Sequence, residues 1–230
     1  MQNDEKGSPL ELPSASPEQG RGISRRSFLL AGLGGGLLAT VGGRWLLSAL
    51  AQAEADYALV IDLNKCVGCR ACESACHQRN QLPEDTSFIR VLTKGDEENR
   101  WYLPVQCQHC QDAPCQSVCP VRATYHHPSG VVLVNPNTCV GCKYCAVACP
   151  YDARRFDEHL GIVNKCWLCL DWVLGGGQPA CVQACVPGAR IFGRRDDPAM
   201  ARLLASGRVK QLHPEFGTNP GVLGYIFPGD

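Results

Sequence analysis

The sequence has no excess charge of either sign. Its 22 lysine and arginine residues balance 22 aspartate and glutamate residues over 230 positions. This balance gives no indication of a nucleic-acid-binding protein or of one that docks on an acidic membrane surface. Aromatic residues make up only 7% of the chain, which has room for one or two modest domains. We therefore expect bound cofactors to supply part of the stability that a larger core would give.

Signatures of a self-contained enzyme are also missing. No phosphate-binding P-loop, nucleophile–base pair or carboxylate dyad stands out along the chain. Beyond the N-terminal segment, no second apolar run reaches the length that a membrane span needs. Substrate chemistry is therefore expected on another chain, and the mature part is expected to have no membrane domain of its own.

What the chain does have is 16 cysteines, which form a repeat of four groups of four. The third group reads CVGCKYCAVACP, and its spacing C-x2-C-x2-C-x3-C-P is the one that bacterial ferredoxins use for iron–sulfur clusters. Gly141 in this run lets the backbone approach a cluster without a side chain in the way. The groups are Cys66, Cys69, Cys72 and Cys76; Cys107, Cys110, Cys115 and Cys119; Cys139, Cys142, Cys145 and Cys149; and Cys166, Cys169, Cys181 and Cys185.

Two other uses of cysteine are compatible with an even count. Disulfides are common in exported proteins, but here they would need four near-identical C-x2-C runs by coincidence. Structural zinc sites usually pair two C-x2-C knuckles, and they have no use for a fourth cysteine followed by proline. The pattern therefore favours iron–sulfur clusters over both alternatives.

Residues 1–53 are expected to form an export signal. After a polar stretch over residues 1–22, which is expected to be disordered, Arg25 and Arg26 precede a glycine-rich apolar segment. This is the pattern of a twin-arginine signal. Because that route carries proteins that are already folded, clusters would be loaded in the reducing cytoplasm and the protein would work in the periplasm.

The end of this segment leaves two outcomes open. Ala51 and Ala53 offer a small-residue cleavage site, so cleavage is the favoured interpretation. The alternative is an uncleaved membrane anchor. The apolar run over residues 28–43 is short for a span, however, and Arg44 interrupts it.

Residues 54–195 are expected to form an α+β fold, followed over residues 196–230 by a helix and an extended tail. Short strands and short helices around the cysteine groups are typical of ferredoxin modules that hold two clusters each. The tail has no helical period and is expected on the surface or against a partner. Strands are expected at residues 57–62, 102–105, 123–125, 131–134, 161–164 and 189–193, and helices at 170–174, from Pro179, and from Pro198 to about Ala205.

Several polar residues near the cysteines are candidates for secondary roles. His126 and His127 could be metal ligands, but a turn between two strands is the favoured interpretation of their position. Lys65, Lys143 and Lys165 each stand next to a cysteine group and could raise the reduction potential of a cluster. We expect them instead to be surface lysines without that effect.

Two stretches in the third and fourth groups point to a known family. CPYDAR at residues 149–154 and CVQACVPGARIFG at residues 181–193, together with the order of the groups, resemble the four-cluster iron–sulfur (beta) subunit of the molybdopterin oxidoreductases, the dimethyl sulfoxide reductase family. The resemblance covers residues 57–227 and is strongest to the beta subunits of tetrathionate, polysulfide and thiosulfate reductases. It implies two bacterial-ferredoxin-like modules, with the first and fourth groups folded together, and the second and third.

The resemblance also implies which cysteines share a cluster. Some relatives have tryptophan at one ligand position and hold a three-iron cluster, but here every position is cysteine, so four [4Fe-4S] clusters are expected. The implied ligand sets are Cys66, Cys69, Cys72 and Cys185 (cluster 1); Cys76, Cys166, Cys169 and Cys181 (cluster 2); Cys107, Cys110, Cys115 and Cys149 (cluster 3); and Cys119, Cys139, Cys142 and Cys145 (cluster 4).

The function that this resemblance implies is electron transfer. The chain would relay electrons one at a time between an integral membrane quinone-reactive subunit and a molybdopterin catalytic subunit, in a reductase of sulfur compounds. It would have no small-molecule substrate of its own, and it would be held at the membrane through its partners. The alternative is the electron-transfer subunit of a nitrite reductase or hydrogenase system.

Overall fold

The computed structural model describes residues 56–84 and 86–229. The expected twin-arginine signal over residues 1–53 lies outside this range. None of the helices in the described residues is both long enough and apolar enough to span a membrane.

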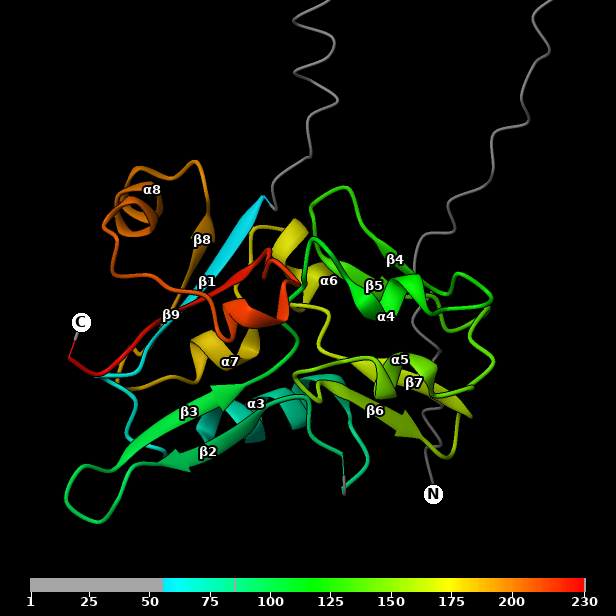
Figure 1. Ribbon diagram of the computed structural model, residues 1–230, viewed down its shortest axis with the longest axis horizontal. Helices are drawn as coiled ribbons and strands as arrows, with labels where there is room; N and C mark the ends of the chain where they lie inside the picture. The colour runs from blue at the N-terminus through cyan, green and yellow to red at the C-terminus, as the bar shows by residue number, and fades with distance from the viewer. Residues whose placement is uncertain (1–55, 85, 230) are drawn as a thin grey trace, which may run out of the picture. The chain divides into compact units, whose positions relative to one another are not determined.

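The centre of one half of the fold is strand β1 (Tyr57–Asp62), every residue of which is buried. β1 pairs antiparallel with β8 (Arg190–Arg194) and parallel with β9 (Leu223–Ile226), and Figure 1 shows it lying between them. A strand with neighbours on both edges and buried faces needs a nearly continuous apolar sequence, and Leu59, Val60 and Ile61 provide it.

The other strands form antiparallel two-stranded hairpins. Each hairpin packs beside a cysteine group, so these strands position the cysteine-bearing loops rather than build a large sheet. The pairs are β2 (Arg90–Lys94) with β3 (Trp101–Val105), β4 (Thr124–His126) with β5 (Val132–Val134), and β6 (Arg154–Asp157) with β7 (Ile162–Lys165).

Short helices carry cysteines and pair across the molecule. Helix α3, which carries Cys72 and Cys76, packs against α7, which carries Cys181; α4, with Cys115, packs against α5, with Cys145. The helices are α3 (Ala71–Asn80), α4 (Pro114–Ser117), α5 (Tyr144–Val147), α6 (Leu170–Leu174), α7 (Ala180–Gln183), α8 (Pro198–Ala205) and the 3-10 helix η1 (Pro214–Phe216).

These helix pairs confirm the expected α+β fold of two ferredoxin-like modules. The first module joins the first and fourth cysteine groups through α3 and α7, and the second module joins the second and third groups through α4 and α5. In Figure 1 the elements of the second module, α4, α5 and β4 to β7, lie together on one side of the molecule.

Most expected strands and helices are confirmed with shifts of one residue at an end. Strand β2 was not expected, because its polar sequence RVLTK reads as part of a long charged segment. Asp197 precedes α8 as expected, but its side chain does not cap that helix. Its carboxylate instead accepts the backbone N–H of Arg194 at 3.2 Å, which ties the start of α8 to the end of β8.

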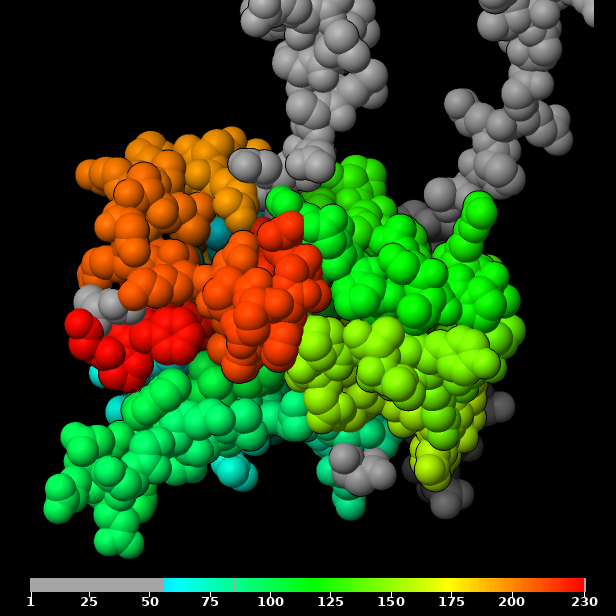
Figure 2. Space-filling model, viewed as in Figure 1, coloured from blue at the N-terminus to red at the C-terminus, as the bar shows by residue number. Residues whose placement is uncertain are grey.

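The C-terminal tail lies on the surface only in part: residues 213–217 are exposed, as expected, but the end of the tail is buried. Strand β9 is fully buried in the sheet of the first module. Before it, the Gly221 N–H donates to the His109 carbonyl at 3.1 Å, and the Asp112 N–H donates to the Thr218 carbonyl at 3.2 Å. Figure 2 shows this segment, in orange-red, lying across one face where the two modules meet. The tail therefore connects the modules. Its strand β9 is short and contains a glycine, so the sequence there shows no clear strand signal.

We predict that Leu59→Ala lowers the free energy of unfolding by about 2–5 kcal/mol, because Leu59 is 0% exposed at the centre of the sheet and its loss leaves a cavity. Leu160→Ala is the control: Leu160 is 66% exposed, and the change should stay within about 0.5 kcal/mol. Anaerobic urea denaturation of the two variants measures the difference. Equal effects would contradict the placement of the core on β1.

Candidate iron–sulfur cluster sites

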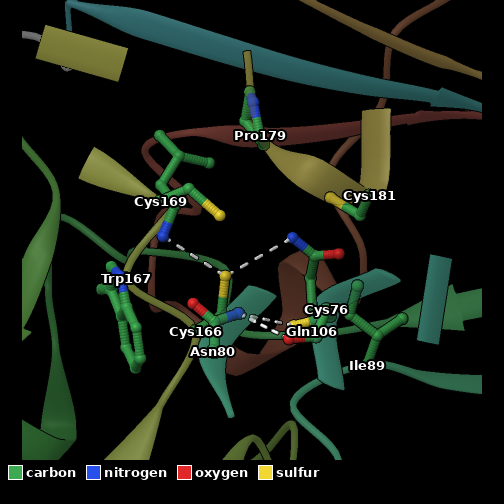
Figure 3. Close-up of a pocket in the computed structure, with 10 residues that line it drawn as sticks. Cys76, Asn80, Ile89, Gln106, Cys166, Trp167, Cys169, Pro179 and Cys181 are labelled. Carbon is green, nitrogen blue, oxygen red and sulfur yellow. Dashed lines mark hydrogen bonds between the residues drawn. The ribbon is translucent and has the colours of Figure 1, made fainter. Parts of the chain in front are cut away.

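Four cysteines from two different groups surround one cavity in the first module. Cys166 and Cys169 come from the loop after β7, Cys181 from α7, and Cys76 from α3. Figure 3 shows their side chains around a common space. These are the four residues that the family resemblance assigns to cluster 2, and we call their cavity site 2.

Two further cavities are lined in the same way. Site 1, in the first module, is lined by Cys66, Cys69, Cys72 and Cys185. Site 4, in the second module, is lined by Cys119, Cys139, Cys142 and Cys145. In each case three cysteines come from one group and the fourth from the group folded against it.

The remaining four cysteines are also neighbours in the second module. The pKa of the Cys110 thiol is raised to about 12, mainly by burial and also by the nearby sulfurs of Cys107, Cys115 and Cys149. Cys149 likewise interacts with Cys107 and Cys115. We call this set site 3. The tail closes over it, because Cys110 forms an isolated β-bridge with Pro220.

The sulfur atoms are arranged for a group larger than one ion. All sixteen cysteines are free thiols. The cluster interpretation requires free thiols, whereas a disulfide scaffold would have them paired. Among residues 56–84 and 86–229, no three or more His, Cys, Asp or Glu side chains are close enough to hold a single metal ion. Four cysteines that face one space, three from one group and one from another, fit the all-thiolate ligation of an iron–sulfur cluster.

Hydrogen-bond donors are directed at several of these sulfurs. At site 2 the Leu168 N–H donates to the Cys166 sulfur at 3.4 Å, and the Gln106 amide approaches the same sulfur at 3.9 Å. The Asn80 amide donates to the Cys76 sulfur at 3.3 Å, as Figure 3 shows. Donors of this kind stabilise the more negative, reduced form of a cluster and so raise its potential.

Burial makes the bare thiols poor anions. It raises the pKa of Cys76 to about 12, and it raises the pKa of Cys166 well above the ordinary value. A buried thiolate needs a positive partner, and coordination to a metal deprotonates a thiol outright. The buried cysteines therefore fit bound iron.

Comparison with known proteins agrees with this geometry. Residues 99–195 match the model of a 4Fe-4S dicluster domain, and residues 57–78 match that of a 4Fe-4S binding domain. The B subunit of tetrathionate reductase from Salmonella typhimurium is 42% identical over 176 residues, covering 72% of this chain and 70% of that protein. The thiosulfate reductase electron transfer subunit of Salmonella typhi is 38% identical, covering 67% of this chain and 84% of the relative.

A third relative is matched over nearly its whole length. The B subunit of polysulfide reductase from Wolinella succinogenes is 37% identical over 181 residues, covering 75% of this chain and 94% of that protein. This chain belongs to the family of iron–sulfur B subunits of sulfur-compound and dimethyl sulfoxide reductases. The protein is therefore an iron–sulfur protein with [4Fe-4S] domains.

The sites of this iron–sulfur subunit follow one another in a row. Where two sites adjoin, the pKa of a thiol in one site is raised first by burial and also by the charge of a sulfur in the other site. Sites 1 and 2, 2 and 3, and 3 and 4 are consecutive neighbours. The pairs of cysteines whose charges interact across these junctions are Cys72 with Cys181, Cys166 with Cys107, and Cys145 with Cys115.

The two ends of the row reach the surface. Of the sixteen cysteines, Cys69 at site 1 and Cys142 at site 4 are exposed, and the others are buried or half-buried. The inner sites 2 and 3 have no exposed cysteine. The iron–sulfur subunit therefore presents one site to solvent at each end and shields the two between them.

The expectation for Lys165 is wrong. Its side chain is not on the surface but only 3% exposed, and Nζ donates to the carbonyls of Val132 and of Cys166, the latter at 2.8 Å. Lys65 and Lys143 are exposed as expected. These three lysines next to cysteines thus differ because Lys165 ends strand β7, beside strand β5, whose Val132 carbonyl it reaches.

Sequence reasoning also missed two buried arginines. Arg190 and Arg154 are 5% and 3% exposed, and they begin strands β8 and β6. A signal for them was present: Arg190 follows Cys185 at the same spacing at which Arg154 follows Cys149. This second repeat runs in step with the third and fourth cysteine groups.

We predict that Gly141→Ala, in the loop of site 4, lowers the stability of the protein more than Gly161→Ala does. Both glycines have positive φ, +65° and +67°, so both substitutions incur a left-handed penalty of about 1–2 kcal/mol. Only at Gly141 would the added Cβ meet a backbone atom, the Gly161 carbonyl oxygen at 2.2 Å.

Thermal unfolding and iron content of the two variants measure this difference. Gly141→Ala should melt at a lower temperature and lose iron from one site, whereas Gly161→Ala should keep its iron. Equal iron content and equal melting temperatures would contradict the close approach at Gly141.

Proposed function

We propose that this chain relays electrons one at a time through four [4Fe-4S] clusters, one at each of sites 1 to 4, with the sixteen cysteines as ligands. The observation that carries this proposal is the convergence of cysteines from two groups on each of three separate cavities. The neighbouring fourth set and the continuous row of sites support it. An isolated metal site would not need such a row.

Each bound cluster would supply one-electron oxidation and reduction. The residues of the chain hold the clusters in order, donate hydrogen bonds to sulfur, and keep water from the inner sites. At site 2 the hydrogen bonds to sulfur come from Gln106 and Asn80. At site 4 the Ala123 N–H donates to the Cys119 sulfur at 3.2 Å.

The exposed ends of the row support two partners. Val67 and Val186 are exposed beside site 1, and Val140, Tyr144 and Val147 are exposed beside site 4. Exposed apolar side chains clustered beside an exposed cysteine are typical of docking surfaces. We infer that one end meets a molybdopterin catalytic subunit and the other an integral membrane quinone-reactive subunit.

The substrate class and compartment rest on the relatives and on the N-terminal sequence. The relatives are named for reductases of tetrathionate, thiosulfate and polysulfide, so we propose a sulfur-compound reductase. Arg25 and Arg26 support twin-arginine export to the periplasm. The protein would then be held at the membrane through its partner subunits.

Purification of the native complex from membranes tests this assignment. The expected result is a larger molybdenum-containing chain and a membrane chain that elute with this protein, and reduction of a sulfur compound by the same fraction. Recovery of a cytochrome c nitrite reductase or a hydrogenase subunit, without molybdenum, would contradict the assignment and support the alternative.

The ligand sets lead to a second prediction. Cys185→Ser should remove or alter the same electron paramagnetic resonance signal as Cys69→Ser, because both residues line site 1. Cys76→Ser should instead match Cys169→Ser, since both line site 2. If ligands followed sequence order, the effects of Cys185→Ser and Cys76→Ser would be exchanged, and the proposed ligand sets would be wrong.

A further inference from the structure

A buried arginine lies between the two sites of the first module. Arg190 Nη1 donates to the Gln106 side-chain oxygen at 2.8 Å and to the sulfur of Cys181, a site 2 residue, at 3.5 Å. Its charge also interacts with Cys72 of site 1. Nη2 has no hydrogen-bond partner among the described residues. The guanidinium therefore faces sulfur from both sites at once.

The second module repeats this arrangement. Arg154 Nη1 donates to the Thr124 hydroxyl at 3.2 Å, while Nε and Nη2 have no partner in the described part of the chain. The arginine charge interacts with Cys115 of site 3 and Cys145 of site 4. Arg154 thus occupies the same place between sites 3 and 4 that Arg190 occupies between sites 1 and 2.

Within the described part of the chain, neither arginine forms an ion pair with a carboxylate. The ion pairs of residues 56–84 and 86–229 that involve Asp or Glu use other cations. A buried charge without a counter-ion is strongly unfavourable. The groups that would carry the opposite charge once bound to iron are the thiols of Cys72 and Cys181 near Arg190, and those of Cys115 and Cys145 near Arg154. The cluster sites therefore give a physical reason for burying both charges.

A third cation lies at the junction between the modules. Lys165 Nζ donates to the carbonyl of Cys166, a site 2 residue. Burial alone would raise the pKa of the Cys107 thiol at site 3, but nearby His109 and Lys165 lower it well below its usual value. Every junction in the row thus has a buried basic side chain.

We infer that Arg190 and Arg154 each serve two clusters, raising the reduction potentials of both neighbours in their module together. A fixed positive charge stabilises the reduced form, which carries one more negative charge than the oxidised form. Because one charge acts on both clusters, it raises both reduction potentials and leaves only a small difference between them. The equilibrium constant for electron exchange between the two clusters of the module then stays close to one. This inference rests on the proposed function.

Anaerobic redox titration of the holoprotein, followed by electron paramagnetic resonance, tests the inference. In Arg190→Gln, two midpoint potentials should fall by about 59 mV or more, a tenfold change in a one-electron equilibrium constant, while the other two stay unchanged. Arg154→Gln should lower the other pair. Arg190→Lys retains the charge and should restore most of the shift.

Arg194→Gln is the matched control. Arg194 lies on the same strand, β8, but is exposed and paired with Asp196 at 2.9 Å, so its loss should leave all four potentials unchanged. Unchanged potentials in Arg190→Gln and Arg154→Gln at full iron content would overturn the inference. So would a shift confined to one cluster in each variant.

Iron content separates charge from packing if a variant assembles poorly. Loss of iron in Arg190→Gln but not in Arg190→Lys supports a role for the charge, because both changes remove the guanidinium. Loss in both variants would indicate a packing role and overturn the inference. An iron-free wild-type protein would instead contradict the proposed function, and the inference with it.

Discussion

The structure depends on the burial of sulfur. A thiolate withdrawn from water is unfavourable unless positive charge lies beside it, and this chain buries many of its sixteen cysteines in two small modules. Bound iron would supply most of that positive charge, and the buried basic residues Arg190, Arg154 and Lys165 would supply the rest. The sheet, hairpins and tail are arranged so that these charges stay together and water stays out.

The modest apolar core follows from the same constraint. Outside the sheet of β1, β8 and β9, the strands are short hairpins that could not hold their shape alone. Eight of the sixteen cysteines belong to the main buried cluster together with residues such as Leu168 and Tyr225. Clusters would therefore be part of the core. The C-terminal tail joins the modules around them, through residues 218–221 to the second cysteine group and through strand β9 to the first module.

The sequence predicted well what depends on local spacing and poorly what depends on distant contacts. Cysteine runs specify their own loops, and strands such as residues 57–62 show their apolar composition directly, so both could be predicted. The burial of Lys165, the pairing of Leu223–Ile226 with β1 and the placement of Arg154 and Arg190 arise from segments far apart in the chain. A charged side chain usually indicates surface. Here the folded arrangement of backbone carbonyls around Lys165, and of thiols near the two arginines, reverses that expectation.

The central claim is that cysteines gathered from paired groups hold four-iron clusters in a row. Mössbauer spectroscopy of anaerobically prepared protein, combined with iron and acid-labile sulfide analysis, tests it most directly. Four clusters of four irons require about 16 iron atoms and about 16 sulfides per chain, all in thiolate-ligated cubane sites. A protein that is colourless, contains zinc in place of iron, or has its cysteines joined in disulfides would contradict the account.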